Sequence, residues 1–183
     1  MAGFWTGVGE GGVVEPKRKF RFRVHFGNLT SSAFWVKTVN KPTFTINAAE
    51  HKYLNYVFYY PGNVTWNEIT LTGVDPIDPD LAKTLAQALD DAGYALPSTA
   101  TEDPRTISKT EATAKLGEVY IQQYNSAGEV VEQWTLHNAW IREVKFGDLE
   151  YGADDLTQVD IVMKYDWATL GTDPGTALLG PTS

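Results

Sequence analysis

Alternating apolar and polar residues run through much of this chain and predict β-strands. In residues 19–26 phenylalanine and valine occupy one side, while lysine, arginine and histidine occupy the other. Residues 156–167 alternate in the same way, with Val159, Ile161 and Met163 on one side. This two-residue period is typical of a strand with two unlike faces. Further strands are predicted from aromatic and β-branched content at 34–39, 43–47, 64–73, 117–124 and 130–145.

Short polar segments rich in glycine, asparagine and aspartate separate these strands. Residues 125–129 turn strand 117–124 into strand 130–145, which predicts one hairpin. Residues 147–155 join strand 130–145 to strand 156–167 and predict a second hairpin, with a bulge near Gly147. A Pro-Gly pair at 61–62 is a turn signal.

One helix is predicted, over about residues 79–92. Asp78 suits the N-cap and Pro79 the first helical position, and Gly93 ends the helix. Leucines at 81, 85 and 89 form an apolar stripe that we expect to lie on a sheet. Residues 94–114 are polar and threonine-rich without apolar periodicity, and they are read as a long loop or an insertion.

Adjacent strands with a single helix predict a mainly β fold, an antiparallel β-sandwich or barrel with one flanking α-helix. A single domain is expected over 19–169. The glycine-rich residues 1–18 form an expected N-terminal arm, and residues 170–183 form an expected C-terminal tail. Both are expected to become ordered only against a neighbour.

The segment 48–62 has an unusual aromatic content. It holds four tyrosines and one phenylalanine. Such side chains either fill a core or contact a partner, because tyrosine combines an apolar ring with a polar hydroxyl. A core strand pair and a partner surface both remain open for this segment.

Composition limits the classes of function. Of 183 residues 43% are hydrophobic and 13% aromatic, enough for a substantial core. The chain has no cysteine, so it forms no disulfide and performs no thiolate chemistry. We expect no signal peptide and no membrane insertion, because no apolar run approaches the roughly 20 residues of a membrane span.

The net charge of −8 disfavours wrapping of nucleic acid. It fits either simple solubility or a surface that does not retain DNA.

No constellation of catalytic residues is evident. His25, His51 and His137 each stand alone, without a second ligand at metal-binding spacing. There is no Gly-x-Ser-x-Gly elbow, and the Gly-x-Gly at 7–9 has no strand before it. The paired acids fall where turns and helix ends use aspartate. An enzyme is therefore not expected, and we predict no catalytic, cofactor-binding or metal-binding residue.

Several segments, in this order, resemble the tube proteins of contractile tails, as in myovirus-type phages, tailocins and type VI secretion systems. Phe-Arg-Phe-Arg-Val at 20–24 precedes Phe-Trp-Val-Lys-Thr-Val at 34–39. Residues 60–73 hold Pro-Gly, Trp and Ile-Thr-Leu in the family's order. Trp-Thr-Leu and Asn-Ala-Trp at 134–140 lead to Tyr-Asp-Trp at 165–167 through a Gly-Asp-Leu-Glu-Tyr turn. Together these segments cover most of residues 18–168.

The resemblance implies a structural virion protein without catalytic activity. Six copies would form a ring, and stacked rings would form the inner tail tube inside a contractile sheath, the conduit for DNA ejection. Strands of neighbouring copies would join in one sheet around the lumen. Residues 45–62 would reach the adjacent ring. Residues 94–114 depart from the shortest members of the family, and contact with the sheath is one role for them.

Expected partners are further copies of the chain, the sheath, the baseplate and the tail terminator, with DNA passing through the lumen unbound. The lumen is therefore expected to be acidic or neutral. The expected location is the virion, after synthesis in the host bacterial cytoplasm. The residues expected at inter-subunit or inter-ring contacts are His51, Lys52, Tyr53, Leu54, Tyr56, Phe58, Tyr59, Phe4, Trp5, Arg21 and Arg23.

Two other readings remain open. The tube could belong to a phage-derived injection device, a tailocin or a type VI secretion-like machine, and this sequence does not separate it from a phage tail. Exposed aromatic residues and Asp-rich loops also fit a carbohydrate-binding β-sandwich. Glycan binding by a monomer would favour that module, and tubes in purified protein would favour the tube.

Overall fold

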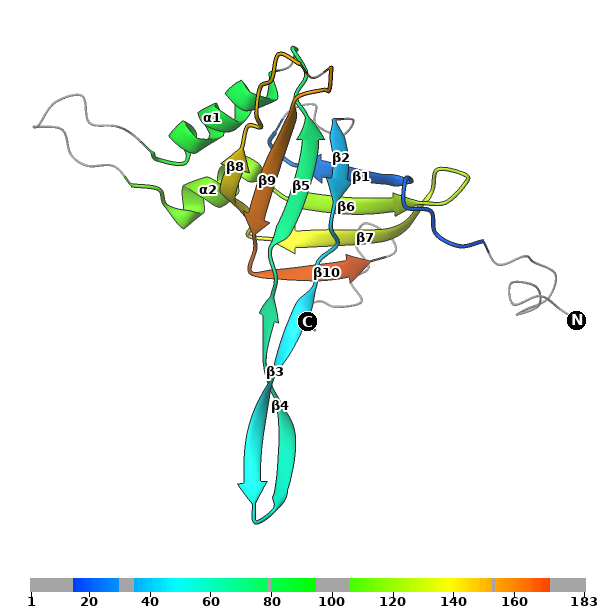
Figure 1. Cartoon of the computed structure of the whole chain (residues 1–183), viewed down its shortest axis with the longest axis vertical. Coiled ribbons are helices and arrows are strands. Elements are labelled where there is room, and N and C mark those ends of the chain that lie inside the picture. Colours follow the sequence, from blue (N-terminus) through cyan, green and yellow to red (C-terminus); the bar gives the residue numbers. More distant parts are fainter. Residues whose placement is uncertain (1–14, 30–34, 79, 95–105, 153, 172–183) are drawn as a thin grey trace, which may run out of the picture.

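Two four-stranded antiparallel sheets and a projecting hairpin make up most of the structure, a computed structural model (Figure 1). It describes residues 15–29, 35–78, 80–94, 106–152 and 154–171. The first sheet has the order β1-β6-β7-β10 and the second the order β2-β5-β9-β8, while β3 and β4 pair only with each other. Strands of one sheet run across those of the other (Figure 1). The predicted antiparallel, mainly β fold is confirmed.

The strands of the first sheet are β1 (Phe22–Phe26), β6 (Val119–Tyr124), β7 (Val130–His137) and β10 (Trp167–Gly171). Those of the second are β2 (Val36–Val39), β5 (Ile69–Val74), β9 (Gln158–Lys164) and β8 (Trp140–Lys145). The hairpin consists of β3 (Phe44–Tyr53) and β4 (Tyr56–Trp66). The helices are α1 (Leu81–Asp91) and α2 (Lys109–Leu116).

The core lies between the sheets and under the helices. Both sheets contribute alternate residues, as their sequence period predicted: Val159, Ile161 and Met163 of β9 are buried. The remaining buried apolar side chains that form this cluster are Val24, Phe26, Trp35, Ile69, Leu71, Leu81, Leu85, Leu116, Val119, Ile121, Leu136, Ala139, Tyr165 and Ala168.

The prediction of one strand over 130–145 is wrong, because the chain changes sheets inside it. β7 ends at His137 in the first sheet, and β8 begins at Trp140 in the second. Asn138 makes the corner with a φ of 54°, a left-handed conformation that asparagine tolerates better than most residues. The predicted strand 156–167 divides in the same way, since β9 stops at Lys164 and Trp167 starts β10.

The predicted hairpin between strands 130–145 and 156–167 is confirmed as the antiparallel pair β8–β9. Its irregularity, however, lies between Ile141 and Glu143 rather than near Gly147. Gly147 has a φ of 78° in the connecting loop, and a Cβ there would lie 2.5 Å from the Gln158 carbonyl oxygen. The hairpin predicted around residues 125–129 is also confirmed, as β6–β7.

Pro61 and Gly62 lie within β4, so the turn predicted there is wrong. The proline is tolerated because β4 pairs on one side only. The chain turns instead at Leu54 and Asn55, where β3 meets β4. The predicted strand 64–73 is interrupted at residues 67–68, between β4 and β5.

The predicted helix is present, with two corrections. Its N-cap is Asp80 rather than Asp78, and the Asp80 carboxylate accepts a hydrogen bond from the Lys83 backbone N–H at 2.8 Å. Leu81 and Leu85 are buried as predicted, but Leu89 is half exposed. Pro79 lies outside the described residues.

A second helix, α2, occupies part of the region predicted as a polar loop, so a single flanking helix is wrong. The Ser108 hydroxyl accepts a hydrogen bond from the Glu111 backbone N–H at 3.1 Å. A serine followed three residues later by glutamate is a capping-box signature. Leu116 carries α2 into the core, and Gly117 ends the helix with a φ of 69°.

Candidate assembly surfaces

The hairpin β3–β4 projects away from the two sheets as an isolated ribbon (Figure 1). Every residue of β3, and all of β4 except Trp66, is exposed. A two-stranded ribbon without packing is marginally stable in water. Within the described part of the chain, this ribbon is therefore a surface left open to a partner.

One face of the ribbon near its tip is aromatic. Cross-strand pairing places Tyr53 opposite Tyr56, and His51 opposite Phe58. Paired residues of an antiparallel ladder share a face, so these rings form a continuous exposed strip. Lys52 lies on the opposite face, 3.9 Å from Glu50. Of the two readings left open for segment 48–62, the core strand pair is wrong, because the described structure leaves this segment exposed. The partner surface stays a prediction.

The turn at the tip is strained. Leu54 has a φ of 51° and is 83% exposed. A leucine in the left-handed region costs roughly 1 kcal/mol compared with an ordinary conformation, and asparagine or glycine would serve a two-residue turn better. A large exposed apolar side chain at such a position is a candidate contact residue.

Aromatic packing fixes the base of the hairpin on the body of the protein. Phe44 meets Trp66 edge to face at 5.4 Å between ring centroids, and Trp66 lies 6.0 Å from Tyr165. The Asn67 backbone N–H donates to the Thr43 carbonyl at 2.9 Å. The hairpin therefore leaves the body in a defined direction, although its tip contacts no other described part of the chain.

The margins of both sheets are a second candidate surface. Among the described residues no strand pairs with the outer edges of β1, β10, β2 or β8, although α2 packs beside β8 (Figure 1). β10 reads Trp-Ala-Thr-Leu-Gly and has neither charge nor proline. Monomeric proteins usually protect an edge strand with charged residues or proline. An edge without them favours pairing with another chain.

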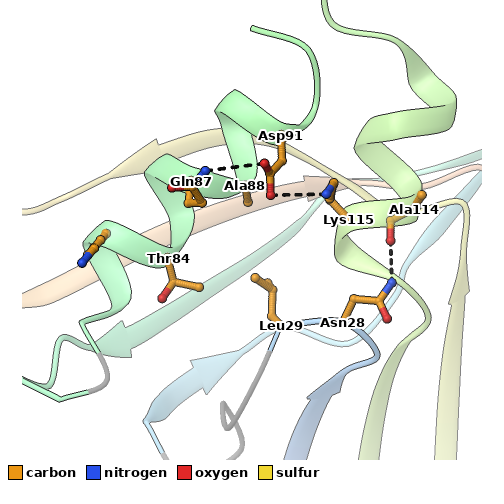
Figure 2. Close-up of a pocket in the computed structure, with 9 residues that line it drawn as sticks. Asn28, Leu29, Thr84, Gln87, Ala88, Asp91, Ala114 and Lys115 are labelled. Carbon is orange, nitrogen blue, oxygen red and sulfur yellow. Dashed lines mark hydrogen bonds and ion pairs between the residues drawn. The ribbon is translucent and has the colours of Figure 1, made fainter.

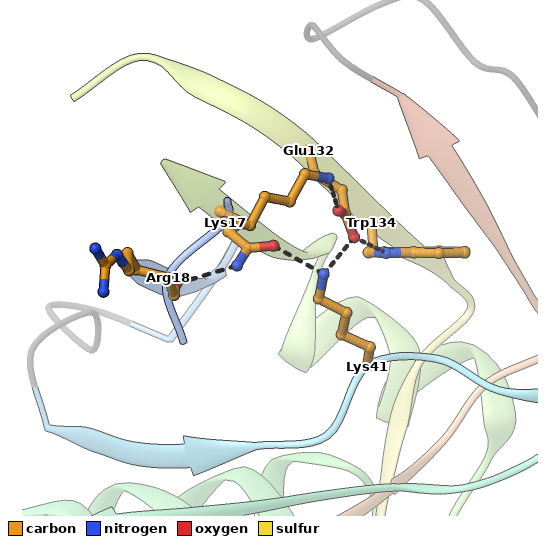
Figure 3. Close-up of polar contacts among 6 residues, drawn as sticks. Lys17, Arg18, Lys41, Glu132 and Trp134 are labelled. Carbon is orange, nitrogen blue, oxygen red and sulfur yellow. Dashed lines mark hydrogen bonds and ion pairs between the residues drawn. The ribbon is translucent and has the colours of Figure 1, made fainter. Parts of the chain in front are cut away.

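The largely buried carboxylate of Glu132 joins the start of the described chain to the base of the hairpin (Figure 3). Glu132 of β7 accepts hydrogen bonds from Lys17, from Lys41 at 2.6 Å and from the Trp134 indole N–H at 2.8 Å. Lys41 also donates to Gln123 at 2.8 Å. Burial would raise the pKa of Glu132, but these hydrogen bonds outweigh it and hold the pKa at about 2.

This contact corrects one expectation. Residues 15–18 were expected to be ordered only by a neighbour, yet they are held by their own chain. Besides the ion pair of Lys17, the Arg18 carbonyl accepts from the Gln123 side chain at 3.2 Å. Residues 1–14, with the expected contacts Phe4 and Trp5, lie outside the described residues, as does the tail from residue 172.

The structure divides the remaining predicted contact residues between two places. His51, Lys52, Tyr53, Leu54, Tyr56, Phe58 and Tyr59 come together on the hairpin. Arg21 and Arg23 lie elsewhere, beside the β6–β7 turn: Arg21 pairs with Glu15 at 3.0 Å, and the Arg23 guanidinium lies 5.9 Å from the Tyr124 ring centroid. The role of each as a contact stays a prediction.

A groove of about 610 Å³ separates the two helices (Figure 2). Leu29, Ala88 and Ala114 contribute apolar walls, and Lys115 pairs with Asp91 at 3.3 Å on the rim. The Asn28 amide donates to the Ala114 carbonyl at 2.5 Å. These residues are ordinary helix-packing and surface groups and offer no nucleophile with a general base.

The described part of the chain holds no group of three or more His, Asp or Glu side chains placed to bind a metal ion. None of its helices is long and apolar enough to span a membrane.

No protein-family model matches the chain, and no curated protein matches it. Solved structures do. A chain in the cryo-EM structure of the anti-feeding prophage tube-terminating cap is 17% identical, with a TM-score of 0.64 over 90% of this chain and 97% of that one. A chain in the sheath/tube terminator of the extracellular contractile injection system PVC, in its extended state, is also 17% identical. Its TM-score is 0.63, covering 87% of this chain and 99% of that one.

A chain in the PVC sheath-tube complex in the extended state is 16% identical, with a TM-score of 0.62 over 86% of this chain and 93% of that one. At these identities the likeness concerns the fold. The chain has the fold found in chains of contractile injection complexes.

Proposed function

We propose that this protein is a structural subunit that builds the inner tube of a contractile injection particle by self-assembly. The observation that carries the proposal is the isolated hairpin, whose exposed aromatic strip has no partner within the described chain. The shared fold supports it, because the matched chains come from a sheath-tube complex and from tube terminators.

In this proposal six copies form a ring and rings stack. Open sheet edges pair with those of neighbouring copies, which removes the exposed edges that a lone subunit leaves unpaired. The hairpin reaches a copy in the adjacent ring, where its aromatic strip becomes buried. The work of the protein is then mechanical, and it needs no catalytic residue or cofactor.

For the particle itself we propose a phage tail, with the sheath, baseplate and terminator as partners and the lumen as the path of DNA. The net charge of −8 supports unhindered passage of a polyanion. A second candidate is an extracellular injection device that carries another cargo. It is supported by the origin of the matched chains, the anti-feeding prophage and PVC complexes.

Electron microscopy of the purified full chain tests the proposal. Negative-stain images and two-dimensional averages are expected to show six-fold rings and stacks of them. Because subunits can wait for a nucleus, the protein is also examined after co-expression with the baseplate genes beside its own. A monomer under both conditions, particularly one that binds glycans on an array, would overturn the proposal.

Particles released from the producing cell separate the two candidates. A capsid attached to the sheathed tail, with nuclease-protected DNA, identifies a phage. Sheathed tubes that lack a capsid and nuclease-protected DNA identify an injection device.

A further inference from the structure

The end of the molecule opposite the hairpin carries an apolar surface of its own, here called the distal end and formed by the described residues of two segments, 75–80 and 146–157. Its apolar side chains are among the most exposed in the described structure: Ile77 is 98%, Leu149 89% and Leu156 71% exposed, and Tyr151 is fully exposed. Soluble proteins rarely gather exposed apolar groups in this way outside an interaction site.

The two loops of the distal end lie together and far from the hairpin. The Asp75 backbone N–H donates to the Thr157 carbonyl at 3.0 Å, and Val74 pairs with Gln158 at the last position of the β5–β9 ladder. β5 starts just after the hairpin and ends at these loops, so the hairpin and the distal end occupy opposite ends of one strand (Figure 1).

The distal end is strongly acidic. Its two segments contain seven aspartate and glutamate residues and no lysine or arginine. Asp80 caps α1, and Asp75 accepts a hydrogen bond from the Leu81 backbone N–H at 3.1 Å. Neither segment contains a cation that could neutralise the remaining acidic side chains. A complementary partner must therefore bring apolar groups together with positive charge.

The base of the hairpin has that chemistry. The hairpin base is defined here by the half-exposed side chains of Phe44, Ile46 and Val64. Close by, four cations meet three carboxylates, because Arg142 also contacts Glu143 at 3.5 Å. Arg142 and Lys164 share Glu68, at 2.6 and 3.6 Å, while Lys17 and Lys41 share Glu132. This end therefore keeps an excess of positive charge beside its apolar groups.

We infer that the distal end of one copy packs against the hairpin base of a second copy, in a head-to-tail contact that gives the stack its direction. Contacts of this kind repeat without limit along an axis. The inference rests on the proposed function and adds the surface that receives each ring. Opposite charge at the two ends disfavours the reversed orientation.

Lengths specify which part of the hairpin faces the distal end. The ten residues of β3 span about 33 Å, whereas the six residues of β5 span about 20 Å. When the ends of two bodies meet, the hairpin extends past the distal end along the side of the next copy. Its base, rather than its tip, therefore lies against Leu149 and its neighbours.

Disulfide trapping tests this arrangement. Because the natural chain has no cysteine, only the introduced cysteines can form a cross-link. Assembled full-length protein carrying Val64→Cys and Leu149→Cys is oxidised and run on a denaturing gel. A ladder of trimers and longer species is expected, because each copy links to two others. The matched control replaces the base cysteine by one at the tip, Asn55→Cys with Leu149→Cys, and is expected to give no ladder.

The gel and the micrographs together distinguish failure of this inference from failure of the proposed function. Tubes on the micrograph without a ladder from the base pair, or with an equal ladder from the tip pair, would overturn the inference and leave the tube proposal standing. Absence of both tubes and ladder would overturn both. A ladder specific to the base pair supports the inference.

Charge reversal gives a second test that needs no cross-link. Asp155→Lys is expected to shift the population from stacks to single rings, because it places a cation against the basic end of the next copy. The control Asp90→Lys changes the net charge equally at an exposed site on α1 and is expected to leave stacking unchanged. Equal stacking by the two variants would contradict the inference.

Discussion

At the scale of single residues, Glu132 of β7 holds together three distant segments of the chain through its ion pairs with Lys17 and Lys41. Its side chain is only 13% exposed, yet it faces two lysines from segments far apart in the sequence. A carboxylate so placed is stable only while its cations are present, since an unpaired buried charge is costly. The sequence could not show this contact, because nothing local relates residues 17, 41 and 132.

We predict that Glu132→Gln lowers the free energy of unfolding by about 1.5–3 kcal/mol, the range for hydrogen bonds to a charged group. The amide keeps the shape but weakens the attraction of Lys17 and Lys41. Urea denaturation monitored by tryptophan fluorescence measures the change. Glu50→Gln is the control, since its exposed pair with Lys52 is expected to contribute under about 0.5 kcal/mol. Equal effects of the two variants would contradict this role.

The same carboxylate predicts a dependence on pH. The pKa of Glu132 is about 2 in the folded protein, below its ordinary value of 4.5. The stability it contributes is therefore complete above pH 4.5 and is lost as the pH falls toward 2. Unfolding measured across this range should show the wild type and Glu132→Gln converging at the acid end. A constant difference down to pH 2 would rule out titration of this group.

Gly73 is needed for a different reason, close packing. A Cβ at this position would lie 2.3 Å from the Cε3 atom of the buried Trp35 ring. Gly73→Ala is predicted to destabilise the fold by about 1–3 kcal/mol through overpacking. Gly152→Ala serves as the control, because its nearest neighbouring atom would be 3.8 Å away. Thermal unfolding compares the two variants, and similar melting temperatures would refute the clash.

At the scale of elements, the sequence predicted most strands because their faces differ. β1 and β9 alternate cleanly and were located within a few residues. β7 and β8 were read as one strand, because both are extended and apolar and only the φ of Asn138 separates them. α2 was missed because its exposed surface lacks an apolar stripe, although Ser108 and Glu111 carried a capping signal that could have located it.

The hairpin is the element whose function is separable from its stability. Replacing Tyr56 and Phe58 by serine removes exposed rings that lie outside the core cluster of the described residues. We predict a change in unfolding free energy within about 0.5 kcal/mol, together with loss of stacked rings on micrographs. Tyr94→Ser, at a comparably exposed ring beside α1, is the control and should still assemble. Intact stacks from the double variant would remove the hairpin from the interface.

At the scale of the whole molecule, the order of strands could not be read from the sequence. The first sheet joins β1 to β6 and β7 to β10, pairs separated by long stretches of chain, and periodicity carries no information about such partners. The contact residues on the hairpin were predicted from aromatic content and from the family resemblance, whereas the distal end was not predicted, because Leu149 and Tyr151 looked like parts of an ordinary turn. Its significance depends on its position opposite the hairpin (Figure 1).

This arrangement predicts which backbone amides assembly protects. In a free subunit the central strands β6, β7, β5 and β9 have neighbours on both sides and should exchange hydrogen slowly. The hairpin and the edge strand β10 should exchange quickly. Assembly into tubes should slow exchange in these two elements while the central strands change little. Hydrogen–deuterium exchange with mass spectrometry on free and assembled protein measures this. Slowing confined to the helical groove around Ala88 would instead place the interface on α1 and α2, and the assembly surfaces proposed above would be wrong.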